Sequence, residues 1–368
     1  MSTNHTYSRP WKSFVEQLAL LHRRGLLIED EGVALMWLQR VGYYRLSAYW
    51  YPFRVFQMEQ DAATGEIRSV RTDDFVPGTV FSDAIGLYLF DRTLRALLAD
   101  ALERIEVSLR VEVAYRLGSA DTFAHLHEDS FHTSFRNKPD HRSGRTAFAA
   151  WQLRHQGLVQ RSKEDFVKHY REKHGPNMPI WVAIEVWDFG SISQLLAMIK
   201  VADQAAIAAR YGIEDWKVFA SWVRALSYLR NLVAHHSRVW NRNMVSEPKL
   251  PPSSALDWCE AFIGKPDLLS KPFVCLAIVR HMLERICPGS RWRIGWRSIC
   301  VAFLPRHPSG NCQSPAWALL TGGSARGALT PDNKNPRVGF EKPRGEGHVA
   351  NSVTQPLGLV QRGRLFRT

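Results

Sequence analysis

Apolar residues recur at three- and four-residue steps along most of this 368-residue chain, the spacing of amphipathic helices. The longest such segment runs from Phe81 to Leu117. Its apolar positions include Ile85, Leu89, Leu94, Leu98, Leu102, Ile105, Leu109 and Val113. A helix of that length buries a stripe of about 50 Å, so we expect it to be the central helix of a bundle.

The remaining periodic segments predict an all-α fold. We expect helices at 11–25, from Asp30 or Glu31 to Arg40, and at 147–173, 180–200, 202–211 and 255–287. Gly25 is a typical residue for the end of the first helix. The polar segment 57–80 contains glycine and proline and predicts a loop or a hairpin, and residues 119–147 predict a loop.

A strongly amphipathic helix is predicted from Trp216 to Leu229, and it leads into a polar motif. Its apolar stripe consists of Phe219, Trp222, Val223, Leu226, Leu229 and Val233. At about 100° per residue, Arg230 falls inside this stripe. Burying an unpaired guanidinium costs several kcal/mol, so we expect Arg230 to have a partner or to face a cleft.

The motif itself, Arg230 to Arg242, gathers two histidines and three arginines at the end of this helix. Asn231 and His235 are four residues apart and share a face, so the amide is placed to orient the imidazole. Arg230 and His235 lie about 140° apart around the helix, so a site that uses both needs another helix or a second copy of the protein. The alternative is an ordinary helix end, where His and Arg interact favourably with the helix dipole.

Three charged residues on the Phe81–Leu117 helix are candidate supports for this site. Glu103, Glu106 and Arg110 recur at three- and four-residue steps. One interpretation is that they face the motif helix and hold the Arg230 guanidinium by pairing with it. The other is a solvated row of salt bridges, worth only a few tenths of a kcal/mol. The sequence favours neither.

The charge balance points to a polyanionic partner. The formal net charge is +13, which favours nucleic acid but does not distinguish RNA from DNA or from an acidic protein. No apolar run reaches the roughly 18 residues of a membrane span, and the first residues show no secretory signal, so we expect no membrane association. The five cysteines are odd in number and lack C-x-x-C spacing, which favours a reduced cytoplasm.

One further segment is a candidate for substrate binding, and a second carries a basic patch that a nucleic-acid-binding regulator would use. The aromatic run Tyr43 to Tyr51 is typical of a packed core, but it also has the side chains that stack on bases, and Tyr44 and Arg45 are the candidates within it. The loop 119–147 carries a basic patch. Its members are Arg136, Lys138, Arg142 and Arg145.

Other suggestive patterns are set aside. Asp188-Phe189-Gly190 spells the metal-binding tripeptide of kinases, but the chain has no glycine-rich phosphate loop and no H-R-D partner. His125, His127 and His132 are close together, yet nothing completes a tetrahedral set at a recognised spacing. We therefore predict neither a metal site nor a cofactor.

From about residue 304 the periodicity ends. Proline, glycine and basic residues dominate 304–368, a composition too poor in apolar residues to offset chain entropy, and it predicts a disordered basic tail. An RNA-binding arm and a shifted or extended reading frame are the alternatives. We divide the chain into an N-terminal helical region (1–80), a helical domain carrying the motif (81–303) and this tail.

These segments together resemble a known family. Arg230-Asn231 followed by Ala234-His235 resembles the R-x4-6-H signature of the HEPN superfamily of helical ribonucleases. The whole stretch is similar to the Abi (abortive infection, AbiD/AbiF-type) phage-resistance proteins of bacteria. Further matching blocks occur in the same order at 10–17, 40–53, 90–110 and 179–190, so the resemblance covers roughly residues 10 to 300.

The resemblance implies an activity and roles for the motif residues. It implies a HEPN-type helical domain that cleaves RNA without a metal ion, leaving 2′,3′-cyclic phosphate and 5′-hydroxyl ends. His235 acts as acid/base, Arg230 holds the phosphate and Asn231 orients the histidine. Two motifs meet across a homodimer interface, which accounts for the 140° separation.

Several residue roles and partners stay open. His236 is a rival base, and Arg238 and Arg242, on an exposed continuation of the motif, are expected to bind the substrate backbone. The expected biological role is that of a phage-defence toxin, with RNA as substrate and an antitoxin or a phage-derived trigger as possible partners. The alternatives are a non-catalytic HEPN-type scaffold that binds RNA or a partner, and a nucleic-acid-binding regulator.

Overall fold

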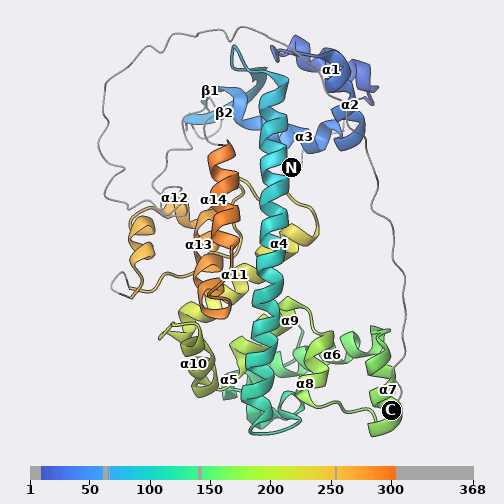
Figure 1. Cartoon of the computed structure of the whole chain (residues 1–368), viewed down its shortest axis with the longest axis vertical. Helices are drawn as coiled ribbons and strands as arrows, with labels where there is room; N and C mark the ends of the chain where they lie inside the picture. The colour runs from blue at the N-terminus through green and yellow to red at the C-terminus, as the bar shows by residue number, and fades with distance from the viewer. Residues whose placement is uncertain (1–9, 61–64, 66, 140–142, 253–254, 304–368) are drawn as a thin grey trace, which may run out of the picture. The chain divides into compact units, whose positions relative to one another are not determined.

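The computed structural model describes residues 10–60, 65, 67–139, 143–252 and 255–303. Within these ranges the regular secondary structure is helical apart from one two-stranded antiparallel hairpin, so the all-α prediction is confirmed (Figure 1). The predicted tail, residues 304–368, lies outside the described residues, as does Arg142 of the basic loop.

The elements are as follows. The α-helices are α1 (Phe14–Arg23), α2 (Glu31–Val41), α3 (Tyr43–Trp50), α4 (Phe81–Gly118), α5 (Thr133–Asn137), α6 (Ala147–Arg161), α7 (Asp165–His174), α8 (Ile180–Ala183), α9 (Phe189–Met198), α10 (Val201–Arg210), α11 (Trp216–Ala234), α12 (Pro266–Leu269), α13 (Pro272–Ile286) and α14 (Trp292–Phe303). The 3-10 helices are η1 (Tyr51–Phe53), η2 (Ala124–Leu126), η3 (Glu128–Ser130), η4 (Ile184–Val186) and η5 (Asp257–Phe262). The strands are β1 (Arg54–Gln60) and β2 (Ile67–Phe75).

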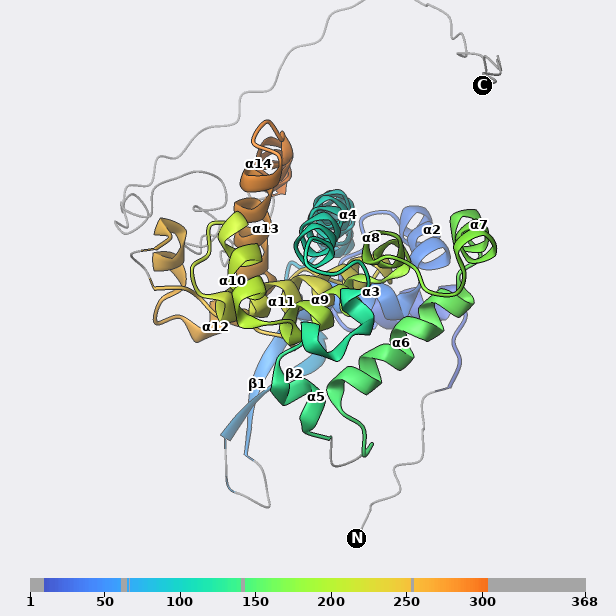
Figure 2. The ribbon, with the colours of Figure 1, turned by 90° about the horizontal axis from the view of Figure 1, so that it is seen from below.

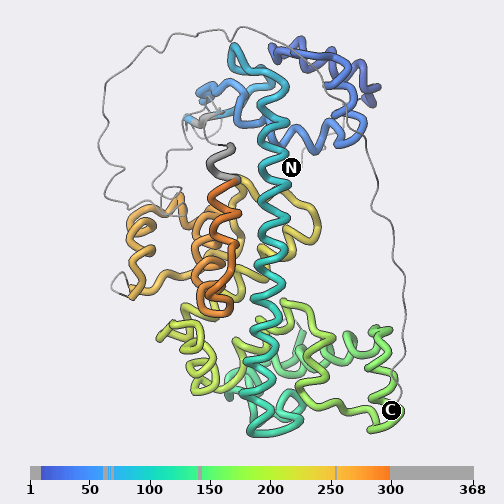
Figure 3. Tube along the Cα trace, in the orientation of Figure 1, coloured from blue at the N-terminus to red at the C-terminus, as the bar shows by residue number. Residues whose placement is uncertain are grey.

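Helix α4 is the central helix that the periodicity predicted. Its 38 residues give a length of about 57 Å, and its apolar stripe is buried except at Leu89, with Leu98, Ile105 and Leu109 inaccessible to solvent. It packs against α3, α8, α9, α10, α11, α13 and α14. In Figure 2, α4 is seen nearly along its axis, and these helices lie on more than one side of it. In Figure 3, α4 extends from the region of the N-terminal helices to the segment 119–200.

The N-terminal elements form as local signals predict. Asp30 caps α2 by accepting a hydrogen bond from the Val33 N–H at 2.9 Å, and Gly25 ends the first helical segment with a φ of +85°. The segment 57–80, predicted as a loop or hairpin, forms the β1–β2 hairpin, whose register shifts between Arg54 and Phe56.

Three predicted helices are interrupted. The segment 147–173 breaks between α6 and α7, where Ser162 and Glu164 have extended backbone. The segment 180–200 breaks before Asp188, whose side chain caps α9 by accepting from the Ser191 N–H at 2.7 Å. The segment 255–287 is divided into η5, α12 and α13, with Gly264 at a φ of +70°.

Helix α14 was not predicted. Trp296 of this helix is fully buried, and the indole N–H of Trp292 donates to the Leu97 carbonyl of α4 at 3.0 Å. Packing of these two tryptophans against the central helix stabilises α14. The apolar residues Trp292, Trp296 and Ile299 recur at helical spacing, so the sequence carried a signal that the prediction missed.

Candidate functional site

The motif lies at the carboxyl end of α11, and the helix stops inside it. Ala234 is the last helical residue, and the His235 N–H donates to the Asn231 carbonyl at 3.0 Å. His236 has a φ of +54°, a left-handed conformation that non-glycine residues adopt rarely and at some cost. This turn redirects the chain, so residues 235–242 form a loop, called the motif loop below, rather than a continuing helix.

Both imidazoles of the motif loop are exposed to solvent, as is Asn231. Among the described residues, no hydrogen bond joins the Asn231 amide to the His235 ring, although their spacing predicted one. The Asn231 carbonyl, rather than its side chain, contacts His235, through the backbone N–H. The two rings are therefore accessible from solvent.

Arg230 has the partner that its position in the apolar stripe required. Its Nε lies 3.3 Å from Oε2 of Glu106, a residue only 6 % exposed on α4. The other oxygen of Glu106 accepts from Arg110 at 2.7 Å, and Arg110 also donates to the Trp187 carbonyl at 2.9 Å. One buried carboxylate therefore holds two guanidiniums, as one of the two interpretations of this row expected.

Glu103 does not take part in this pairing. Its side chain is exposed, and it forms no ion pair or hydrogen bond with any described residue. The reason is its place on α4, three residues before Glu106 on the solvent side. The expectation that all three charged residues support the site is therefore wrong for Glu103 and holds for Glu106 and Arg110.

Asp91, a residue that the sequence analysis gave no role, fixes the motif loop. It is fully buried in α4 and accepts hydrogen bonds from the backbone N–H groups of Val239 at 3.1 Å and Trp240 at 2.7 Å. The Tyr49 hydroxyl donates to its other oxygen at 2.6 Å, and Arg95 forms an ion pair with it. A signal for this buried pair was present in the sequence, where Asp91 and Arg95 stand four residues apart within an apolar stripe. Charged residues are rarely buried unless they are paired, so this spacing indicates a buried ion pair.

Burial of this network shifts the pKa of its tyrosine. The pKa of Tyr49 is raised, first by burial and then by the charge of Asp91. Tyr49 therefore keeps its proton and acts as a donor. A carboxylate with four donors around it is a well-satisfied buried acceptor, so this network is rigid and positions the loop that carries the two histidines.

Helix α3 also contacts the motif loop. Arg45 donates from Nη1 to the His236 carbonyl at 2.8 Å, although the two residues are 191 positions apart. Tyr44 is 91 % exposed and its ring contacts solvent, whereas Tyr49 and Trp50 are buried, so the aromatic run is mainly core, as the composition favoured.

Arg238 and Arg242 are not on an exposed continuation, and that expectation is wrong. Arg238 is partly buried and donates from Nη1 to the Ala48 carbonyl at 3.0 Å, and burial lowers its pKa. Arg242 is also partly buried, and its N–H donates to the Val239 carbonyl at 3.3 Å. The cause is the turn at His236, which directs the chain back against α3 and α4.

The three neighbouring histidines have separate surroundings. His125 is buried against His155 and Trp187, His127 pairs with Asp121, and His132 contacts Ser134. Burial lowers the pKa of His125 to about 3 and that of His155 to about 4, so both rings are neutral near pH 7. Within the described ranges, no three His, Cys, Asp or Glu side chains gather in a metal-binding arrangement.

The exposed histidines and the half-exposed Arg230 together supply the groups needed for acid–base chemistry on a phosphate. An imidazole changes charge near neutral pH, and a guanidinium offers paired donors to phosphate oxygens. His235 and Arg230 nevertheless face different directions around α11, about 140° apart.

Comparison with known proteins identifies a family. The family model described as Abi-like protein matches residues 36–241, more than half of the chain, a range that includes α3, α4, α11 and nearly all of the motif. Neither a curated protein nor a solved structure gives a significant match. In the described part of the chain, no helix has the length and apolar content needed to cross a membrane.

Proposed function

The chain belongs to the Abi-like protein family, and on this basis we propose that it is an abortive-infection ribonuclease of HEPN type. In this proposal, phage infection activates the protein, which then cleaves cellular RNA and stops growth. RNA is the substrate, no metal ion takes part in catalysis, and a phage-derived trigger or an antitoxin controls the activity. The net charge of +13 favours such a polyanionic substrate.

The observation that carries the proposal is the pair of exposed imidazoles on a loop that the protein holds rigidly. Arg45 holds the backbone of the motif loop at its turn and Asp91 holds it after the turn, while the side chains of His235 and His236 stay open to solvent. A catalytic group must be held within about 0.5 Å of its productive position, and such supporting contacts provide this. A loop with a purely structural role has no need of two solvent-exposed imidazoles.

The reaction follows from the chemistry of RNA. His235 removes the proton of a ribose 2′-hydroxyl, and the 2′-oxygen attacks the adjacent phosphorus. The bond from phosphorus to the 5′-oxygen breaks, and a protonated imidazole gives that oxygen its proton. The products are a 2′,3′-cyclic phosphate and a 5′-hydroxyl. His236 is the alternative base, because it is adjacent and equally open.

Arg230 stabilises the negative charge that develops on the phosphate oxygens. Its Nε faces Glu106, and its terminal amino groups form no hydrogen bond with a described residue. A guanidinium held at one edge presents the other edge to an anion, and charge that is already in place before the reaction lowers the barrier strongly. Glu106 and Arg110 therefore act as positioning residues for Arg230.

The 140° between Arg230 and His235 leads us to propose a homodimer with a composite site. Beside the Glu106–Arg110 pair, Val107, Val111 and Tyr115 form a row of apolar side chains on α4 that are 48 %, 61 % and 79 % exposed. Arg110, Val111 and Tyr115 also line a cavity of about 460 Å³. A second copy packed on this face brings its own motif near the first.

The experiment compares wild type with His235→Ala, His236→Ala and Arg230→Lys on total RNA in EDTA. His169→Ala is the control, because His169 is also exposed but lies on α7. We expect cleavage by wild type and by His169→Ala, and loss in His235→Ala. Arg230→Lys keeps the charge but loses the paired donors, so we expect a reduced rate.

The other outcomes assign different functions. Loss of cleavage in His236→Ala but not in His235→Ala moves the base by one residue. Equal cleavage by all proteins contradicts the assignment. RNA binding that weakens steeply with salt, with no cleavage by any protein even after phage infection, favours a non-catalytic scaffold or regulator.

A further inference from the structure

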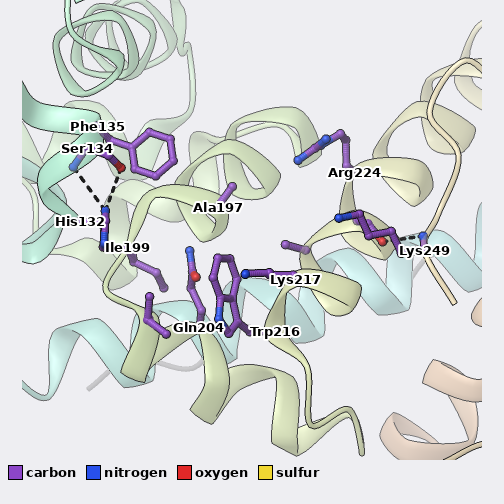
Figure 4. Close-up of a pocket in the computed structure, with 13 residues that line it drawn as sticks. His132, Ser134, Phe135, Ala197, Ile199, Gln204, Trp216, Lys217, Arg224 and Lys249 are labelled. Atoms are coloured by element: carbon purple, nitrogen blue, oxygen red, sulfur yellow. Dashed lines mark hydrogen bonds between the residues drawn. The ribbon is translucent and has the colours of Figure 1, made fainter. Parts of the chain in front are cut away.

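A cavity of about 480 Å³ lies where α5, α9, α10 and the start of α11 meet (Figure 4). Its walls include Phe135, Gln204, Trp216, Lys217, Arg224 and Lys249. A second cavity of about 340 Å³ shares Phe135, Ala197 and Arg224 with the first and reaches Ser227 on the next turn of α11. The two cavities therefore share part of one wall along α11, and together they are called the α11 groove below.

The charged side chains that line the α11 groove are all cationic. Lys217, Arg224 and Lys249 line it, while neither cavity has an Asp or Glu among its lining residues. Within the described residues, the side chains of these three cations form no ion pair or hydrogen bond. Cations without a balancing carboxylate around a hollow raise the local concentration of anions.

The α11 groove also has features suited to a nucleobase. Trp216 and Phe135 offer partly exposed aromatic rings, on which any base stacks. Gln204 is 3 % exposed, its Nε2 donates to the Leu196 carbonyl at 2.9 Å, and its buried Oε1 has no donor among the described residues. In Figure 4, Gln204 and Trp216 lie side by side, with Arg224 and Lys249 further along the cavity.

The α11 groove lies on the same face of α11 as the proposed base. Lys217, Arg224, Asn231 and His235 follow one another at steps of seven, seven and four residues, which places them within about 40° of one another. From Arg224 to His235 the helix rises by about 16 Å. Arg230 lies on the other side, against α4.

We propose that the α11 groove binds one nucleotide of the RNA strand, while a phosphate elsewhere in the same strand reacts at His235. The base stacks on Trp216, an N–H of the base donates to Gln204, and the backbone phosphates contact Arg224 and Lys249. This inference rests on the proposed function and adds a binding subsite about 16 Å or more from the reacting group.

The test measures binding without cleavage. A fluorescent short oligoribonucleotide with 2′-O-methyl groups, which cannot be cleaved through the 2′-oxygen, is titrated with the full chain and followed by anisotropy. We expect Arg224→Glu to weaken binding at least tenfold. Lys163→Glu is the charge-matched control, because Lys163 is exposed between α6 and α7, away from the groove, and we expect a change of less than twofold.

The aromatic contact has its own readout. Trp216→Ala should weaken binding about tenfold without changing the slope of log Kd against log salt, because stacking involves no charge. Trp216→Phe keeps an aromatic ring and should restore the affinity. Arg224→Ala should reduce that slope by about one. Unchanged affinity in both Trp216→Ala and Arg224→Glu, or equal effects of Arg224→Glu and Lys163→Glu, would overturn the inference.

Competition and cleavage separate this inference from its alternatives. Mononucleotides with a 5′-phosphate should not displace the strand at concentrations near its Kd, and efficient displacement would instead identify a free nucleotide as the occupant. Arg224-dependent binding in a protein that never cleaves RNA would leave the subsite standing and overturn the ribonuclease. Cleavage unaffected by Arg224→Glu, with unchanged binding, would overturn the subsite alone.

Discussion

Replacing Asp91 by Asn tests whether one buried carboxylate holds the motif loop. The oxygens of Asp91 accept from the Tyr49 hydroxyl and from the backbone N–H groups of Val239 and Trp240. Arg95 forms an ion pair with the same carboxylate. Asn keeps the shape but exchanges one acceptor oxygen for an NH2 donor. In one orientation that donor faces the guanidinium, and in the other it faces the two backbone donors.

The expected loss of stability is large because the partner charge stays buried. The Arg95 side chain is 8 % exposed, and removing one member of a buried ion pair typically costs about 3–5 kcal/mol. That is a large part of the roughly 5–15 kcal/mol that stabilises a folded protein. Asp100→Asn is the matched control on the same helix. Asp100 pairs with Arg104 in the same i,i+4 geometry, but the two side chains are 49 % and 42 % exposed, so we expect a loss of at most about 0.5 kcal/mol.

Two measurements report the result. Urea unfolding gives the free-energy difference, and hydrogen exchange at the Val239 and Trp240 amides reports whether the motif loop is released. We expect Asp91→Asn to lose protection at both amides and to lose RNA cleavage, with neither change in Asp100→Asn. Equal destabilisation by the two substitutions, or full protection of both amides in Asp91→Asn, would refute this reasoning.

Three further predictions follow from other parts of the structure. Burial lowers the pKa of His125 to about 3 and of His155 to about 4 from 6.5, so their contribution to stability is present above pH 6.5 and is lost as the pH falls toward 4 for His155 and toward 3 for His125. Each histidine should lower the free energy of unfolding by about 2 kcal/mol when the pH falls from 7 to 5. In His155→Phe, urea unfolding at the two pH values should show a difference that is smaller by the contribution of His155. Glu106→Gln should reduce stability by about 2 kcal/mol and slow cleavage, whereas Glu103→Gln, an exposed neighbour, should do neither. Val111→Asp should convert a dimer to a monomer in light scattering and abolish cleavage, while Glu103→Gln should remain dimeric.

Local patterns predicted most of the helices. The apolar period of α4 and the capping residue Asp30 act within a few residues, and both predictions are confirmed. Two breaks within predicted helices were missed because the prediction followed apolar periodicity alone. Asp188 starts a new helix as its capping residue, and Gly264 turns the chain through a positive φ, and neither effect changes the apolar period. Helix α14 was missed although its apolar residues recur at helical spacing.

The candidate site was predicted in part. The position of Arg230 within an apolar stripe required a partner, and Glu106 is that partner. The contacts that fix the motif loop join residues far apart in the chain, from Asp91 to Trp240 and from Arg45 to His236, and no short-range pattern specifies them. The turn at His236, which withdraws two arginines from solvent, depends on these same contacts.

The most direct test of the ribonuclease uses one RNA oligonucleotide and its matched derivative. The site of cleavage is mapped on the RNA in EDTA, and the same strand is then made with a single 2′-deoxy residue at that site. The account predicts cleavage of the RNA with 2′,3′-cyclic phosphate and 5′-hydroxyl ends, and no cleavage at the deoxy position. Equal cleavage of both strands, or products that carry a 5′-phosphate, would contradict it, because the 2′-oxygen would then not be the nucleophile.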